Sequence, residues 1–272
     1  MAEPLPPGNL QFLDVCAVFA NLWIMKRERV DVRETPSPEV LLQRAIAARS
    51  ADARARYARK GLSCRAPLDR VTQSMLLRQL YLAHFEQQRF AKALEIAQQM
   101  LKLGILADVC HQDVARAMVA LGDVDGAADH LRLAARVGPA RRRAFHLWTL
   151  GSILYVHGRF DLAESALRRA VRWGTTDRAL YAGHLALVRL SRGQPVPDLP
   201  NLIEQLEQAA CGQGYGRFVL GMLCVHASRR ADAHRYLEAF AKRTRSGRKA
   251  LELALQGELK LADRHIRDLV LN

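Results

Sequence analysis

The segment that comes nearest to a catalytic loop is glycine-rich: residues 212–216 read Gly-Gln-Gly-Tyr-Gly. A phosphate-binding loop needs a Lys followed by Ser or Thr after its glycines, and a dinucleotide-binding loop needs a strand before them. Neither feature accompanies this segment. We therefore interpret it as a turn between helical units, and the sequence predicts no nucleotide site.

Cysteine and histidine lack the spacings that metal sites need. The five cysteines are scattered without a Cys-x-x-Cys pair, which predicts neither a disulfide framework nor a zinc site and fits a reducing cytosol. No His-Glu-x-x-His occurs, and His226 and His234 are eight residues apart instead of four. We interpret the cysteines as small buried hydrophobes. We expect no cofactor or metal, and we predict that the chain is not an enzyme.

Basic residues are abundant and gather in four places. Lys and Arg number 41 against 27 Asp and Glu, a net charge of +14. The clusters are residues 54–60, 141–143, 168–172 and 242–249. One interpretation is solvated helix faces, and the other is a surface for an acidic protein, a nucleic acid or an anionic membrane. A nucleic-acid platform usually interleaves aromatic residues with its charges, and only Tyr57 does so here. We favour solvated faces.

The composition favours helices in a sizeable buried core. Half of the 272 residues are hydrophobic, only 6% are aromatic, and Ala, Leu, Arg and Gln, all good helix formers, are plentiful. The proline-rich first residues lack the basic start of an export signal, and the apolar stretch 12–25 is too short and too polar to span a bilayer. We expect a cytoplasmic protein.

A helix-turn-helix pattern recurs along the chain. Residues 88–93 read Gln-Arg-Phe-Ala-Lys-Ala, and residues 122–127 and 158–163 follow the same scheme. Their last residues, Ala93, Ala127 and Ala163, are 34 and 36 residues apart. Further copies end at Ala233 and Ala262. A period near 34 indicates tandem units of two antiparallel helices.

The repeated positions have a packing logic. Small residues such as Gly151 and Ala163 let two helices approach closely, and larger apolar residues at i, i+3, i+4 and i+7 seal the pair. Gly122 and Gly158 stand where the first helix must end in a left-handed residue. Pro139 opens a new helix because it cannot continue one.

These patterns resemble tetratricopeptide repeats (TPR), whose consensus has a Leu-Gly pair, a Gly-Asp-Tyr turn, several alanines and a closing Pro. The resemblance implies an all-α, right-handed α-solenoid of about six hairpins. The repeat domain would span residues 38–272, after an N-terminal segment 1–37 with an apolar helix that caps the solenoid or binds a partner. The clearest repeats are 74–107, 108–141 and 144–177. The copies 179–210, 214–245 and 246–272 diverge, and in the first of them we expect the second helix to start late, near Leu202. Residues 38–67 are a diverged candidate, with one helix expected over residues 38–49 and another over residues 51–62.

In TPR proteins the first helix of each repeat lines a concave groove. The resemblance therefore implies partner-binding residues at Arg78, Leu82, Phe85, Gln112, Arg116, Trp148, Ser152 and Tyr155. Met75, Val119 and Phe145 belong to the same faces. Arginine and aromatic residues are frequent interface anchors, although aromatics at these positions also pack between repeats.

Two functions follow from this reading. The first is a non-catalytic adaptor that docks a segment of another protein in the groove, where the basic charge of the chain would suit an acidic partner. The alternative is a basic helical-repeat protein that binds nucleic acid or another anionic partner in a regulatory role.

Overall fold

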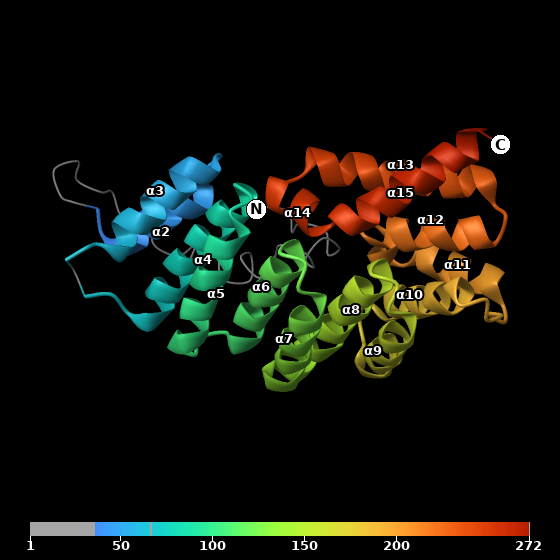
Figure 1. Ribbon diagram of the computed structural model, residues 1–272, viewed down its shortest axis with the longest axis horizontal. Helices are drawn as coiled ribbons and strands as arrows, with labels where there is room; N and C mark the ends of the chain where they lie inside the picture. The colour runs from blue at the N-terminus through green and yellow to red at the C-terminus, as the bar shows by residue number, and fades with distance from the viewer. Residues whose placement is uncertain (1–35, 66, 272) are drawn as a thin grey trace, which may run out of the picture.

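The computed structural model describes residues 36–65 and 67–271, and in these ranges the chain is helical (Figure 1). The predicted apolar helix of the N-terminal segment lies outside these ranges, so its role as a cap or as a partner-binding element stays a prediction. The elements are α2 (Pro38–Ala47), α3 (Ala51–Leu62), α4 (Arg70–Glu86), α5 (Phe90–Leu103), α6 (Ala107–Ala120), α7 (Val124–Val137), α8 (Ala140–Val156), α9 (Phe160–Trp173), α10 (Arg178–Ser191), α11 (Leu199–Gln208), a 3-10 turn η1 (Ala210–Gly212), α12 (Gly216–His226), α13 (Arg230–Ser246), α14 (Lys249–Ala254) and α15 (Gln256–Leu271).

The helices form tandem hairpins. Each helix from α2 to α10 packs on the next one along the chain, and α12 packs on α13. The pairs stack side by side, so the chain advances in one direction as it zigzags (Figure 1). The predicted all-α solenoid is confirmed in the described part of the chain.

Close helix approach explains the recurring small residues. A Cβ added to Gly151 of α8 would lie 2.5 Å from Cγ of Leu167 on α9, and one added to Gly221 of α12 would lie 2.6 Å from Cγ of Leu237 on α13. Ala163 has no exposed surface. Only small side chains allow the paired helices to come this near.

Left-handed residues end the first helix of several hairpins. Gly122 and Gly158 have φ angles of +88° and +70°, which confirms that prediction. At the matching turns, Gln88 and Ser228 also have positive φ angles, of 58° and 57°. A non-glycine residue in this region costs about 1 kcal/mol or more, because its Cβ crowds the following carbonyl.

Local signals set other helix limits. The predicted helices over residues 38–49 and 51–62 are observed, although α2 ends two residues early, at Ala47. Ser37 and Ser50 cap α2 and α3 by accepting hydrogen bonds from backbone N–H groups. The second helix of the 179–210 copy begins at Leu199, three residues before the predicted start near Leu202, with Pro200 in its first turn.

The C-terminal helices turn back across the solenoid. The short α14 packs on α4, whereas α15 packs on α13 and also contacts α12 and α8. Figure 1 shows this return, with α14 placed beside the end of the blue-green helix α4. No helix among the described residues is both long and apolar enough to cross a membrane.

Candidate protein-binding groove

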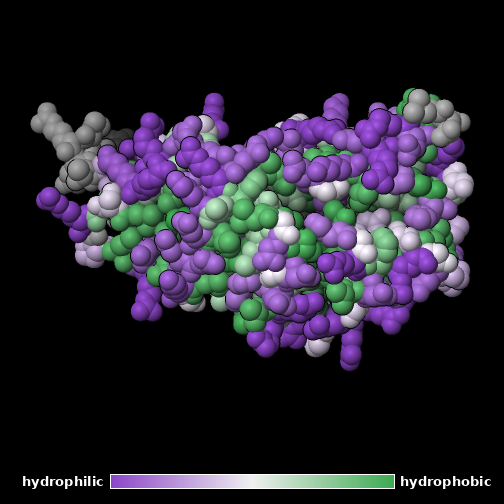
Figure 2. Space-filling view, in the orientation of Figure 1, coloured by the Kyte–Doolittle hydropathy of each residue, from purple (hydrophilic) through white to green (hydrophobic). Residues whose placement is uncertain are grey.

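The returning C-terminal segment leaves a cavity of about 230 Å³ against the first helices of the solenoid. One wall comes from α4, α5, α6 and the end of α8, and the other comes from residues 253–260. Apolar side chains such as Phe85, Val119 and Ile153 line it together with the cationic side chains of Arg116 and Lys260. Figure 2 shows hydrophobic residues gathering on this face over α4 and α6. The cavity lining therefore combines apolar surface with cationic side chains and the carboxyl group of Glu258.

A buried hydrogen-bond network joins the segment to the solenoid. Ser152 Oγ of α8 and the Tyr215 hydroxyl lie 2.5 Å apart, and both donate to Oε1 of Glu258 on α15, at 3.0 and 3.1 Å. Glu258 is 6% exposed. Burial raises the pKa of its carboxyl above the usual value, because the charged form loses hydration. Burial also raises the pKa of Tyr215.

Small residues bring the segment close to its neighbours. A Cβ added to Gly257 would lie 2.2 Å from Cγ1 of Val156 on α8. Ala250 is buried in one apolar cluster with Tyr81 and Phe85 of α4. The backbone of residues 250–257 therefore lies directly on α4 and α8.

An ionic cluster joins α4 to α6 beside this surface. Nε of Arg78 donates to Oδ2 of Asp113 at 2.9 Å, and Nη1 of Arg116 lies 3.5 Å from Oδ1. The Tyr81 hydroxyl donates to the backbone carbonyl of Asp113. Arg78 therefore forms an ion pair within the solenoid, with the buried carboxylate of Asp113.

An aromatic cluster fills the space between α8, α10 and the turn before α12. The Trp148 ring centroid lies 4.8 Å from that of Tyr215 in an edge-to-face arrangement and 6.0 Å from that of Tyr181. Tyr155 packs against Phe160 and His184. Trp148 is 1% exposed, which fits the packing between repeats that the sequence left open.

Three of the eight predicted partner-binding residues line the cavity region: Leu82, Phe85 and Arg116. Leu82 and Arg116 are half-buried, and the other six are buried: Arg78, Phe85, Gln112, Trp148, Ser152 and Tyr155. Binding of a partner by the eight residues stays a prediction.

Sequence reasoning missed Tyr215, Gly257 and Glu258. For Tyr215, the glycine-rich segment 212–216 was the sequence signal that could have pointed to it. A Cβ on Gly212 would lie 1.9 Å from the Leu206 carbonyl oxygen, and Gly214 has a φ of +61°. The glycines therefore make a compact turn that places Tyr215 in the core.

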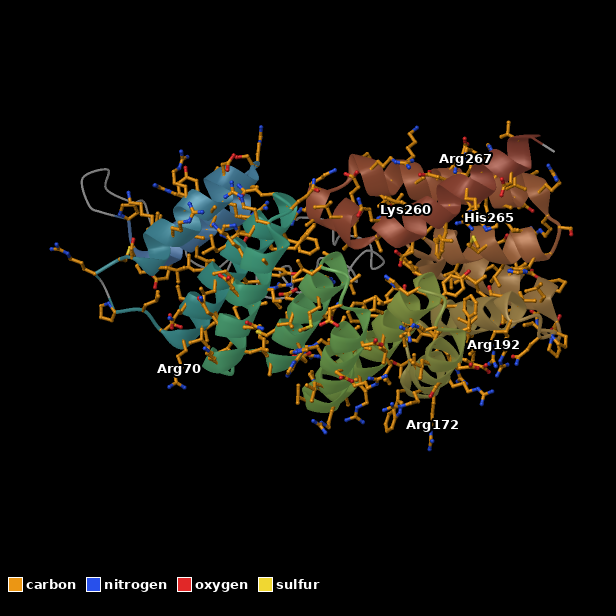
Figure 3. All side chains as sticks on the ribbon, in the orientation of Figure 1. Arg70, Arg172, Arg192, Lys260, His265 and Arg267 are labelled. Atoms are coloured by element: carbon orange, nitrogen blue, oxygen red, sulfur yellow. The ribbon has the colours of Figure 1, made fainter. Side chains whose placement is uncertain are left out.

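The four basic clusters include residues that pair within the fold. Arg54 pairs with Glu86, Arg142 makes two hydrogen bonds to Asp108 at 2.7 and 2.8 Å, Arg168 pairs with Glu164, and Arg245 pairs with Asp263. Other arginines, such as Arg70 and Arg172, point outward from the edge of the molecule (Figure 3). Internal pairing accounts for part of the positive charge without an external anion.

Histidines 111 and 130 form a pair between α6 and α7, with their Nδ1 atoms 3.0 Å apart. Burial lowers the pKa of both rings. Within the described residues, no group of three or more His, Cys, Asp or Glu side chains is arranged to hold a metal ion.

Comparison with solved structures identifies the fold. This chain is similar to the apo form of RapI: the alignment covers 94% of this chain and 92% of the RapI chain, with 14% sequence identity and a TM-score of 0.53. It is also similar to a chain of the APC/C hetero-tetramer Cut9–Hcn1: the alignment covers 96% of this chain and 53% of that chain, with 15% sequence identity and a TM-score of 0.56. No protein-family model matches the sequence, and no curated protein does. Both structures are of TPR proteins, so the chain has a TPR-like fold.

Proposed function

We propose that this protein is a non-catalytic scaffold that docks a segment of another protein on the inner face of its solenoid. The observation that carries the proposal is that this face already holds a helical segment, residues 249–260 of the chain itself. These residues are the short helix α14 and the start of α15. A surface that accommodates helical segments of this chain has the shape and lining to accommodate a helical segment of a partner. The TPR-like fold supports the same role, because it offers a pre-formed extended surface.

The composition of the lining supports an acidic partner. Arg116, His157 and Lys260 line the cavity among apolar side chains, with Glu258 as the carboxylate among the lining residues, and the chain carries a net charge of +14. Positive charge speeds the encounter with an acidic segment and makes the association rate fall as salt is added. The nucleic-acid alternative gains no support from a specific observation, since the basic clusters supply internal ion pairs.

Affinity capture from the native host tests the proposal. The full chain is compared with Leu82→Asp and Val119→Asp, which place a carboxylate on the inner face. The matched control is Val137→Asp, at a half-exposed position on α7. All samples are treated with nuclease, and folding is checked by circular dichroism.

The expected result is a captured protein that the wild type and Val137→Asp retain and both inner-face variants lose. Raising the salt concentration should slow its association. The proposal would be refuted if all four chains captured the same amount of the protein, or if they captured only nuclease-sensitive material.

A further inference from the structure

We propose that one edge of the solenoid, at the start of α8 and the end of α9, binds the surface of an anionic phospholipid membrane. The edge shares no residue with the cavity lining, so it is a second interface, independent of partner docking on the inner face. We call it the arginine edge. It consists of Trp173 and the arginines around it: Arg136, Arg141, Arg143, Arg169, Arg172 and Arg178.

The fold brings these residues together from separate parts of the sequence. Helix α7 ends just before α8 begins at Ala140, so the end of one and the start of the other lie at the same edge. Helices α8 and α9 pack as one hairpin, so α9 ends at Trp173 beside the start of α8, and α10 begins there at Arg178 (Figure 1). Two of the basic clusters of the sequence, 141–143 and 168–172, therefore meet.

A half-exposed tryptophan joins the two clusters. The guanidinium carbon of Arg143 lies over the indole ring of Trp173, 4.8 Å from its centroid. Trp173 is 48% exposed, so one face of the ring is covered and much of the rest meets solvent. An exposed indole among arginines unites the two features by which peripheral proteins hold to a membrane interface.

The positive charge of the arginine edge is not neutralised by carboxylates of the fold. Within the described residues, none of its arginines forms an ion pair with an acidic side chain. In contrast, Arg142 beside them is paired with Asp108, and Arg168 is paired with Glu164. Asp177, in the connection between α9 and α10, is buried. The edge therefore fits an external anion better than the internally paired arginines do.

The aromatic content of the edge indicates which anion it fits. A nucleic-acid strand needs several free aromatic faces on which successive bases stack, and Trp173 is one ring with one face already covered. An acidic peptide would pair with the arginines, but its carboxylates offer nothing to an exposed indole. A phospholipid interface accepts the indole at the level of the headgroups, while the guanidinium groups bind the phosphates.

Cosedimentation with vesicles tests the proposal on the full-length chain. The vesicles contain phosphatidylcholine alone or phosphatidylcholine with roughly one third phosphatidylserine. The test variant is Arg141→Gln with Arg172→Gln, at two exposed positions. The matched control, Arg264→Gln with Arg267→Gln, removes the same charge from exposed positions of α15. Arg172 and Arg267 lie on opposite sides of the molecule in Figure 3. Circular dichroism checks the folding of each variant.

The wild type should bind the phosphatidylserine vesicles and not those of phosphatidylcholine alone, and added salt should weaken the binding. Each basic residue near an anionic surface strengthens binding about fivefold, so the test variant should bind about 25-fold more weakly than the wild type. The control variant should stay within about threefold of the wild type, because its charges lie beyond the screening length.

Tryptophan fluorescence gives a second readout at the same edge. The emission of the wild type should shift to the blue when the vesicles bind, because the indole of Trp173 leaves water for the headgroup region. Trp173→Phe should lose this shift, which separates Trp173 from the other tryptophans of the chain. An identical shift in the wild type and in Trp173→Phe would place the membrane contact elsewhere and refute the inference.

Three other outcomes would also overturn it. The first is a wild type that fails to bind the phosphatidylserine vesicles. The second is equal weakening by the test and control variants, which would reduce the effect to net charge. The third is binding of single-stranded RNA or polyglutamate, but not of the vesicles, that depends on Arg141 and Arg172. The scaffold proposal is unaffected by any of these, since it depends on Leu82 and Val119 of the inner face.

Discussion

The protein should lose stability below neutral pH because of one buried histidine. His184 of α10 has no exposed surface, and neither ring nitrogen makes a hydrogen bond within the described part of the chain. Its ring packs against Tyr155 and Tyr215, with centroids 5.4 and 5.9 Å away. Burial lowers its pKa from 6.5 to about 3, because a charged imidazole in this apolar site would lose its hydration.

The size of the effect follows from proton linkage. Between these two pKa values the unfolded state binds more protons than the folded state, so the free energy of unfolding falls as the pH drops below 6.5. One pKa unit corresponds to about 1.4 kcal/mol, so His184 alone removes about 2 kcal/mol between pH 7 and pH 5. Against a typical domain stability of roughly 5–15 kcal/mol, this loss is readily measured.

The assay is urea unfolding of the wild type and His184→Leu at pH 7 and pH 5. Leucine keeps an apolar side chain in the site and cannot bind a proton. The wild type should lose about 2 kcal/mol more than the variant over this interval. Histidines elsewhere contribute to both proteins and cancel in the difference. If both proteins lose the same stability, the reasoning about His184 is refuted.

Three further predictions concern the packing of the solenoid, and urea unfolding at neutral pH checks each one. Gly151→Leu should destabilise the protein by about 1–3 kcal/mol, because its Cβ would collide with Leu167; a change within experimental error would contradict the close approach of α8 and α9. Asp108→Ala should cost about 3 kcal/mol, because it leaves both Arg142 and the buried ring of His146 without their shared partner, and a neutral effect would show that these contacts add nothing to stability. Gly122→Val should cost about 1 kcal/mol or more because of its φ of +88°; unchanged stability would argue against the left-handed turn.

The repeat pattern alone was sufficient to predict the fold class. Close helix pairs need a small residue at Gly151, and sharp turns favour glycine at positions such as Gly122 and Gly158. Both demands act between residues near in sequence, so they recur with the period of the unit. The same locality explains why α2 and α3 begin where they were predicted to begin: Ser37 and Ser50 cap their first turns through hydrogen bonds to residues three positions along the chain.

The predicted groove residues were a harder case. One helix face carries both the residues that line a groove and those that pack between repeats, so periodicity cannot separate Arg116 from Trp148. Burial separates them only after neighbouring hairpins are placed. Arg78 looked like a binding residue because its partner, Asp113, lies on the next hairpin.

The tertiary structure alone decided what occupies the inner face. Ser152 meets Tyr215 and Glu258 across separations of 63 and 106 residues, far beyond any repeat period. Whether residues 249–260 extend the solenoid or turn back onto it depends on the accumulated bend of all the hairpins between α4 and α13. That bend is a sum of small packing rotations, and no single residue or motif encodes it.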